Sequence, residues 1–275
     1  AEKRAFAGGF INAGASFGQF VYAPLAQALI SSFGWMTAML GLAASTLLSL
    51  PMIAALRGDK TPPQITATPI AAGPTLREQL RLALRDRSYL LLHASFFTCG
   101  VHIAFLVTHL PGEVALCGLP ASVSATALAL IGLFNIAGSL SAGVLGSRVR
   151  MKNILFWMYA SRALVIAIYL VSPRTALTFY LFAAALGFSW LATVPPTAGL
   201  VGKLFGTRYL ATLFGLTLFS HQTGAFFGAW LGGLTISRFG DYGWMWYADL
   251  LLAALAALSC LPIREASPRT APLAA

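Results

Sequence analysis

Eight apolar stretches of this sequence are each long enough to cross a lipid bilayer, and this feature constrains the fold more than any other. A helix needs about 20 apolar residues to cross the hydrocarbon core. Because lipid offers no hydrogen-bond partners, the backbone of such a stretch must bond to itself, as it does in a helix. We therefore predict an all-α integral membrane protein with eight transmembrane helices. They run approximately over Phe6–Ile30, Trp35–Leu56, Tyr89–Leu110, Ala121–Leu145, Ile154–Val171, Leu177–Val201, Tyr209–Ile236 and Trp244–Leu261.

The composition excludes the main soluble alternatives. Of the 275 residues, 58% are hydrophobic and only 9% are charged, whereas a soluble domain carries about a quarter of its residues as charged ones. A soluble enzyme is therefore excluded, as is a disordered chain, which needs low hydrophobicity and high charge. The cysteines Cys99, Cys117 and Cys260 lie far apart and form no C-x-x-C pair. No disulfide framework, metal site or cofactor is expected.

The net charge of +10 indicates a topology and not a nucleic-acid partner. Fifteen of the 18 basic residues fall in segments that alternate, loop by loop, onto one predicted side of the membrane. Only Arg174 and Arg238 fall on the other side, and Arg162 lies within a predicted helix. Basic residues collect in cytoplasmic loops. We expect a multi-pass protein of the inner (plasma) membrane, in contact with lipid, with both termini in the cytoplasm.

An internal repeat indicates how the helices are grouped. The second predicted helix opens with Gly-Trp-Met at Gly34–Met36, and the last opens with the same residues at Gly243–Met245. Both close with Leu-Pro, at Leu50–Pro51 and Leu261–Pro262. If the last pair completes a six-helix unit, the first pair completes an equivalent unit whose four earlier helices are missing. The predicted division is residues 1–56 as the end of an N-terminal half, 57–88 as a cytoplasmic loop, 89–262 as a six-helix C-terminal half and 263–275 as a cytoplasmic tail.

Two six-helix repeats joined by a long loop resemble the plan of the major facilitator superfamily. A loop motif strengthens the resemblance, with glycines suited to close helix packing and a basic run suited to anchoring the loop at the membrane face. Ser147 stands where the superfamily has an acid, so a charge clasp between helices is weakened here. By this resemblance the helices correspond to helices five to twelve of twelve. The motif consists of Gly138, Gly143, Gly146, Arg148, Arg150 and Lys152.

Within that superfamily the chain resembles bacterial carriers related to the monocarboxylate and oxalate/formate group. The Asp and Arg that animal monocarboxylate carriers place four apart on the eighth helix correspond to Asn135 and Ser139, so that chemistry does not transfer. The resemblance further implies that two helices line a central cavity. They are the seventh of twelve, here Tyr89–Leu110, and the tenth, here Leu177–Val201. The stretches that support the resemblance are Phe96–Gly100, Thr108–Pro111, Phe205–Tyr209 and Ser220–Gln222.

Arg162 is the most informative candidate residue. It lies ten residues beyond Lys152, which places it about 15 Å along a helix and near the middle of the bilayer. An unpaired cation is costly there. One interpretation is that Arg162 binds the carboxylate of a substrate, because the guanidinium matches carboxylate geometry. The other, which we favour at this point, is a structural ion pair with Asp249, the only acid in a predicted helix.

Other polar groups extend the candidate site. His102, Trp190, Thr193, His221 and Gln222 are further candidates for substrate binding, although each could instead join neighbouring helices. The adjacent prolines of the tenth helix should bend it, and bent helices of transporters are often gates. The residues predicted to form a gate or hinge are Gly100, Pro195 and Pro196.

The function predicted from these features is secondary transport of a small solute by alternating access, and the Arg and His groups favour an organic anion. Proton coupling is an open expectation. Efflux of multidrug or amphipathic compounds is one alternative, and a non-transporting remnant or scaffold is another, since a chain without the first four helices should not complete alternating access alone. An intramembrane enzyme is disfavoured, because no clustered catalytic set is visible.

Overall fold

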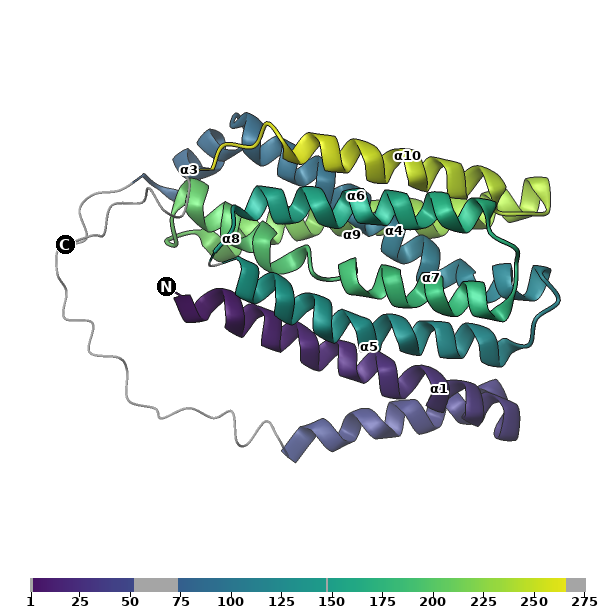
Figure 1. Cartoon of the computed structure of the whole chain (residues 1–275). Helices are drawn as coiled ribbons and strands as arrows, with labels where there is room; N and C mark the ends of the chain where they lie inside the picture. Colours follow the sequence, from purple (N-terminus) through teal and green to yellow (C-terminus); the bar gives the residue numbers. More distant parts are fainter. Residues whose placement is uncertain (1, 52–73, 147, 266–275) are drawn as a thin grey trace.

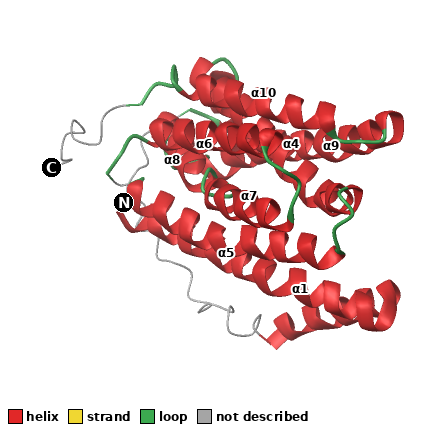
Figure 2. Ribbon diagram, turned by 45° about the vertical axis from the view of Figure 1, so that its right-hand side comes forward, coloured by secondary structure: helices red, strands yellow, loops and turns green. Residues whose placement is uncertain are grey.

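The computed structural model describes residues 2–51, 74–146 and 148–265. In these ranges every regular element is a helix (Figure 1, Figure 2). The predicted all-α fold is therefore confirmed. The elements are α1 (Glu2–Thr46), the short 3-10 turn η1 (Leu47–Ser49), α3 (Leu76–Ala83), α4 (Arg87–Leu116), α5 (Ala121–Leu145), α6 (Met151–Val171), α7 (Ala176–Ser189), α8 (Val194–Phe205), α9 (Leu210–Phe239) and α10 (Gly243–Cys260).

The first two predicted helices form the single element α1, which reverses direction at Gly34. The backbone of Gly34 is non-helical, with φ 78° and ψ 165°. A positive φ is strained for residues with a Cβ, so glycine is the natural residue at this turn. In Figure 1 the two parts of α1 run in opposite directions. The end of the second predicted helix, from residue 52, lies outside the described residues.

Six segments of the described chain are long and apolar enough to cross a membrane, whereas the sequence analysis predicted eight. The difference has two local causes. The two parts of α1 are counted as one segment, although the backbone at Gly34 between them is not helical. Helix α9 is 30 residues long but is not among the six, because the polar run Ser220–Thr223 lowers the hydropathy of its middle. In Figure 1, α9 nevertheless extends along the bundle as the other long helices do.

The helices pack in pairs whose partners are distant in sequence. Helix α4 lies along α9, α6 along α10, and α5 lies between α1 and α7. Glycines allow the closest of these contacts. A Cβ added to Gly100 would lie 1.8 Å from the carbonyl oxygen of His221, and one added to Gly228 would lie 2.1 Å from that of Val101. The stripe of glycines on α9 therefore presses its backbone against α4, as small residues do in membrane bundles.

Basic side chains gather at one end of the bundle. The short helix α3 lies at this end, together with the chain start and the last described residues (Figure 1). Its first turn is fixed by a capping box, in which Thr75 and Glu78 exchange hydrogen bonds. These bonds from Thr75 hold the pKa of Glu78 below its usual range. The two cations assigned to the opposite side, Arg174 and Arg238, lie at the far end of α6 and α9.

The glycine packing gives a direct prediction for stability. Gly228→Ala should lower the free energy of unfolding by about 1–3 kcal/mol, since the added methyl group overpacks the α4–α9 contact. Gly215→Ala is the matched control on the same helix, because a Cβ there would meet nothing within 4 Å. Thermal melting in detergent micelles compares the two variants. Equal melting temperatures would contradict the close α4–α9 contact.

Candidate functional site

The predicted helix Leu177–Val201, which corresponds to the tenth helix of the superfamily plan, is broken inside the bundle. It forms α7 and α8, which are separated by Trp190–Thr193. Pro195 and Pro196 occupy the first turn of α8. Proline has no N–H to donate and cannot continue an α-helix from the preceding turn. The predicted bend is thus present as a full break, and the last carbonyls of α7 need donors from elsewhere.

Arg162 supplies those donors. Its Nη2 donates to the carbonyl oxygens of Ser189 at 2.8 Å and Trp190 at 3.1 Å. The side chain is 0% exposed. Its Nη1 also approaches Cys99 Sγ at 3.6 Å. A cation at the C-terminal end of a helix is stabilised by the helix dipole. Arg162 therefore extends from α6 between the broken helix and α4.

Asn135 holds the break from α5. Its Oδ1 accepts a hydrogen bond from Leu191 N–H at 2.8 Å, and its Nδ2 donates to Ser16 Oγ of α1 at 2.6 Å. Ser139, one turn further on, donates to Asn135 Oδ1 at 3.4 Å. Asn135 and Ser139 are both 0% exposed. The two positions that the sequence analysis matched to the charged pair of monocarboxylate carriers thus hold neutral groups, and one of them, Asn135, binds the backbone of the break.

The predicted ion pair between Arg162 and Asp249 is wrong in this structure. Asp249 Oδ2 lies 2.5 Å from His102 Nδ1, and both side chains are 0% exposed. The expected neighbourhood of α6 and α10 is present. However, the guanidinium of Arg162 turns toward the carbonyls that the break leaves free, and His102 of α4 reaches the carboxylate instead.

This pairing leaves Arg162 without a carboxylate partner among the described residues. Its hydrogen bonds go to two carbonyls and a thiol, and its Nε has no hydrogen-bond partner within the described part of the chain. Asp249 Oδ1 and His102 Nε2 are likewise buried without a partner there. Buried polar groups usually have partners. The interior of the bundle therefore holds a cation and a His–Asp pair with unused bonding capacity.

The remaining binding candidates divide into buried and exposed ones. Trp190 lies 5.9 Å from His102 between ring centroids, and Thr193 Oγ1 lies 3.5 Å from Cys99 Sγ. Both Trp190 and Thr193 are buried. His221 is half-buried, with its ring 4.9 Å from that of Phe96. Gln222 is exposed and contacts only His221 among these candidates. The structure thus brings His102, Arg162, Trp190 and Thr193 together and places His221 at their edge.

Sequence reasoning missed the residue at the centre of this cluster. Cys99 is fully buried and touches both Arg162 and Thr193. It lies next to Gly100, whose helical backbone packs against His221. The sequence carries one indication, since Cys99 belongs to the Phe96–Gly100 stretch that resembles carriers. For Gly100 the structure shows close packing, and its role as a hinge stays a prediction.

The loop motif is anchored by an acid that the sequence analysis did not identify. Glu265, beyond the end of α10, accepts hydrogen bonds from the N–H groups of Met151 and Lys152 at the start of α6. It also forms an ion pair with Lys203 of α8 at 2.7 Å. Lys152 Nζ donates to the carbonyl of Leu261 at 2.8 Å. The start of α6 is thus bound by a carboxylate that follows α10.

The other residues of the motif have separate roles. A Cβ on Gly138 would lie 1.8 Å from the carbonyl oxygen of Phe188, so this glycine joins α5 to α7. Gly143 is buried and Gly146 caps the C-terminal end of α5. Arg148 and Arg150 are exposed. The packing expected of the glycines is present at Gly138, and the basic run lies at the end of the bundle.

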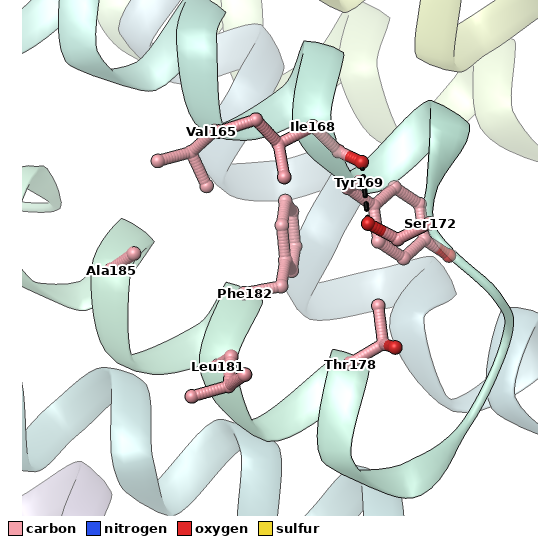
Figure 3. Close-up of a pocket in the computed structure, with 8 residues that line it drawn as sticks. All are labelled: Val165, Ile168, Tyr169, Ser172, Thr178, Leu181, Phe182 and Ala185. Atoms are coloured by element: carbon pink, nitrogen blue, oxygen red, sulfur yellow. Dashed lines mark hydrogen bonds between the residues drawn. The ribbon is translucent and has the colours of Figure 1, made fainter.

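One open pocket lies away from the buried cluster. It has a volume of about 230 Å³ and lies between α6 and α7 (Figure 3). Phe182 points across it toward Val165 and Ile168, and Ser172 at its rim donates to the Ile168 carbonyl at 2.7 Å. Its lining includes neither Arg162 nor the His102–Asp249 pair. We therefore place the candidate site at the break and not in this pocket.

Comparison with known proteins identifies the family. Residues 1–229 match the family model of the Major Facilitator Superfamily, and the chain belongs to that superfamily. It is a multi-pass membrane protein. Relatives include the uncharacterized MFS-type transporter YcxA of Bacillus subtilis, 27% identical over 80% of the chain. Monocarboxylate transporter 13 of Rattus norvegicus and that of Bos taurus are each 27% identical over 95% of the chain. The chain spans 54%, 60% and 61% of these three relatives, respectively.

The pairing of the buried charges can be tested by double-mutant cycles. In the His102→Ala and Asp249→Ala cycle, we expect a coupling energy of at least about 1 kcal/mol, as for residues in direct contact. The cycle between Arg162→Ala and Asp249→Ala should give a smaller value, because their side chains do not bond. Unfolding in mixed micelles supplies the free energies. A larger coupling energy between Arg162 and Asp249 than between His102 and Asp249 would contradict the observed pairing and support the Arg162–Asp249 ion pair.

Proposed function

We propose that the protein is a secondary transporter that moves a small organic anion across the membrane by alternating access. The observation that carries the proposal is the buried guanidinium of Arg162, which has no carboxylate partner in the described part of the chain. A buried cation without a partner of opposite charge is costly in a membrane. A substrate carboxylate would remove that cost, and the Nε–H of Arg162, which has no partner in the described part of the chain, would be free to donate to it.

The position of Arg162 supports a role near the transport path. Its guanidinium lies between Cys99 of α4 and the break between α7 and α8. These elements correspond to the seventh and tenth helices, which line the central cavity in this superfamily. In transporters, broken helices whose free backbone groups point at a site near the midplane often form the binding site. In this proposal α8 is the gating segment, and Pro195 and Pro196 fix the break.

The relatives support a carboxylate as the substrate class. Two of them are named monocarboxylate transporters. A monocarboxylate has one charge, which matches the one cation at the break. Amphipathic efflux substrates would use the aromatic residues and would not need Arg162. Trp190 is buried against His102, so the arginine, and not an aromatic surface, dominates this site.

The number of charges in the same cluster supports proton coupling as part of this proposal. With a neutral His102 and an ionised Asp249, the cluster of Arg162, His102 and Asp249 has no net charge. One added proton on the His–Asp pair makes the cluster positive, and a bound carboxylate then restores neutrality. Proton and anion would enter together, because each reduces the cost of burying the other. The pair is buried at 2.5 Å, close enough to hold one proton between its members.

The charge distribution supports the orientation. The basic loops and both ends of the described chain share one end of the bundle, and such loops are retained in the cytoplasm. We therefore propose the inner membrane as the location, with both termini cytoplasmic. The proposed role is transport and not catalysis.

Substitution of Arg162 tests the anion proposal. In vesicles that carry the intact protein, Arg162→Met should reduce uptake of a labelled monocarboxylate such as lactate by at least about tenfold, a loss of about 1.4 kcal/mol. Arg162→Lys should retain part of the activity, since it keeps the charge without the planar fork. Arg238→Gln, which also removes one cation, is the control because Arg238 is exposed at the far end of α9.

The same vesicles test the proton. Uptake should rise with an imposed acid-outside gradient in the wild type, and Asp249→Asn should abolish that rise.

If Arg162→Met transports carboxylates normally at normal protein levels, Arg162 does not bind the substrate.

A further inference from the structure

Asn135 occupies the point where three separate elements meet. It belongs to α5, binds the side chain of Ser16 on α1, and binds the backbone N–H of Leu191 in the break. The sequence repeat assigns α1 to the first half and α5 to the second. One amide side chain therefore connects the two halves of the protein with the broken helix.

The contact between α1 and α5 is tight at this level. A Cβ added to Gly132, one turn before Asn135, would lie 2.7 Å from the backbone nitrogen of Phe20 and 2.8 Å from the carbonyl oxygen of Ser16. Nearby, Gln19 Nε2 donates to the carbonyl of Leu128 at 3.0 Å. Packed backbones at this distance cannot slide independently of the side chains between them. A shift of α1 relative to α5 must therefore change the bond between Ser16 and Asn135.

The other arm of Asn135 ends inside the break. Leu191 follows Trp190, whose carbonyl accepts from Arg162, and precedes Thr193, whose hydroxyl contacts Cys99. Trp190, Leu191 and Thr193 all belong to the four residues that separate α7 from α8. A displacement at Leu191 would therefore also move the acceptors of Arg162.

We infer that Asn135 is a positioning residue that transmits the movement of α1 against α5 to the α7–α8 break and, through it, to Arg162. The inference rests on the proposed alternating-access function, which requires the two halves to move relative to each other. The neutral amide suits this role, because it donates to one element and accepts from another at the same time. An ionised carboxylate could only accept.

Cys99 provides a reporter that needs no substrate. Its thiol is buried against Thr193 and should react with a maleimide only when the break opens. The measurement is the labelling rate of the intact protein in membranes, with the variants Cys117→Ser and Cys260→Ala combined as background. Ser16→Ala removes the α1 arm of Asn135 and leaves the Leu191 arm. We expect a roughly threefold to tenfold faster labelling, as for the loss of one buried hydrogen bond.

One further variant and a second set of measurements on Ser16→Ala separate positioning from general stability. Ser139→Ala removes a bond to Asn135 from its own helix and should label like the background protein. Ser16→Ala should lower the maximal rate of lactate uptake with little change in KM and little change in melting temperature. If Ser16→Ala labels no faster than the background, or no faster than Ser139→Ala, Asn135 has only a structural role.

The result for Asn135 and the result for transport can be told apart. Faster labelling of Ser16→Ala in a protein that takes up no carboxylate supports the link through Asn135 and contradicts the proposed substrate. Normal carboxylate uptake with unchanged labelling supports the proposed function and overturns the link.

Discussion

The arginine that caps a broken helix inside the bundle is the interaction on which the rest of this structure depends. Pro195 and Pro196 end the regular hydrogen bonding between α7 and α8, at a depth where no water is expected. The carbonyls of Ser189 and Trp190 are then satisfied by Arg162, and the N–H of Leu191 is satisfied by Asn135. Without these two side chains the break would leave backbone groups unpaired in the membrane, at a cost of several kcal/mol each.

The surrounding fold holds this constellation in place through close backbone contacts. Glycines bring α4 against α9 and α5 against α7, so that Cys99, His102 and Asn135 reach the break from either side. At the basic end, Glu265 ties the start of α6 to the end of α8. The position of Arg162 along α6 is therefore fixed relative to the carbonyls that it binds. Because the packing around it is rigid, the irregular segment between α7 and α8 can hold Arg162 in one position and can move as a unit.

Much of the fold could be predicted from the sequence, because apolar length, glycine spacing and adjacent prolines act locally. The break followed from Pro195 and Pro196, whereas the mid-bilayer depth inferred for Arg162 from its distance to Lys152 stays a prediction. The choice of partners could not be predicted in this way. Whether Asp249 binds Arg162 or His102 depends on how three helices rotate against one another. Glu265 reaches α6 across more than a hundred residues, and a buried Cys99 looks like any apolar residue in sequence.

The most direct test of the anion site is ligand-induced stabilisation of the purified intact protein. Its melting temperature would be measured with small carboxylates and with the corresponding neutral amides at equal concentrations. A ligand that binds only the folded state raises the melting temperature by mass action. We expect stabilisation by some carboxylates and by none of the amides. Stabilisation by amides or neutral amphipathic compounds, with none from carboxylates, would contradict a carboxylate site at Arg162.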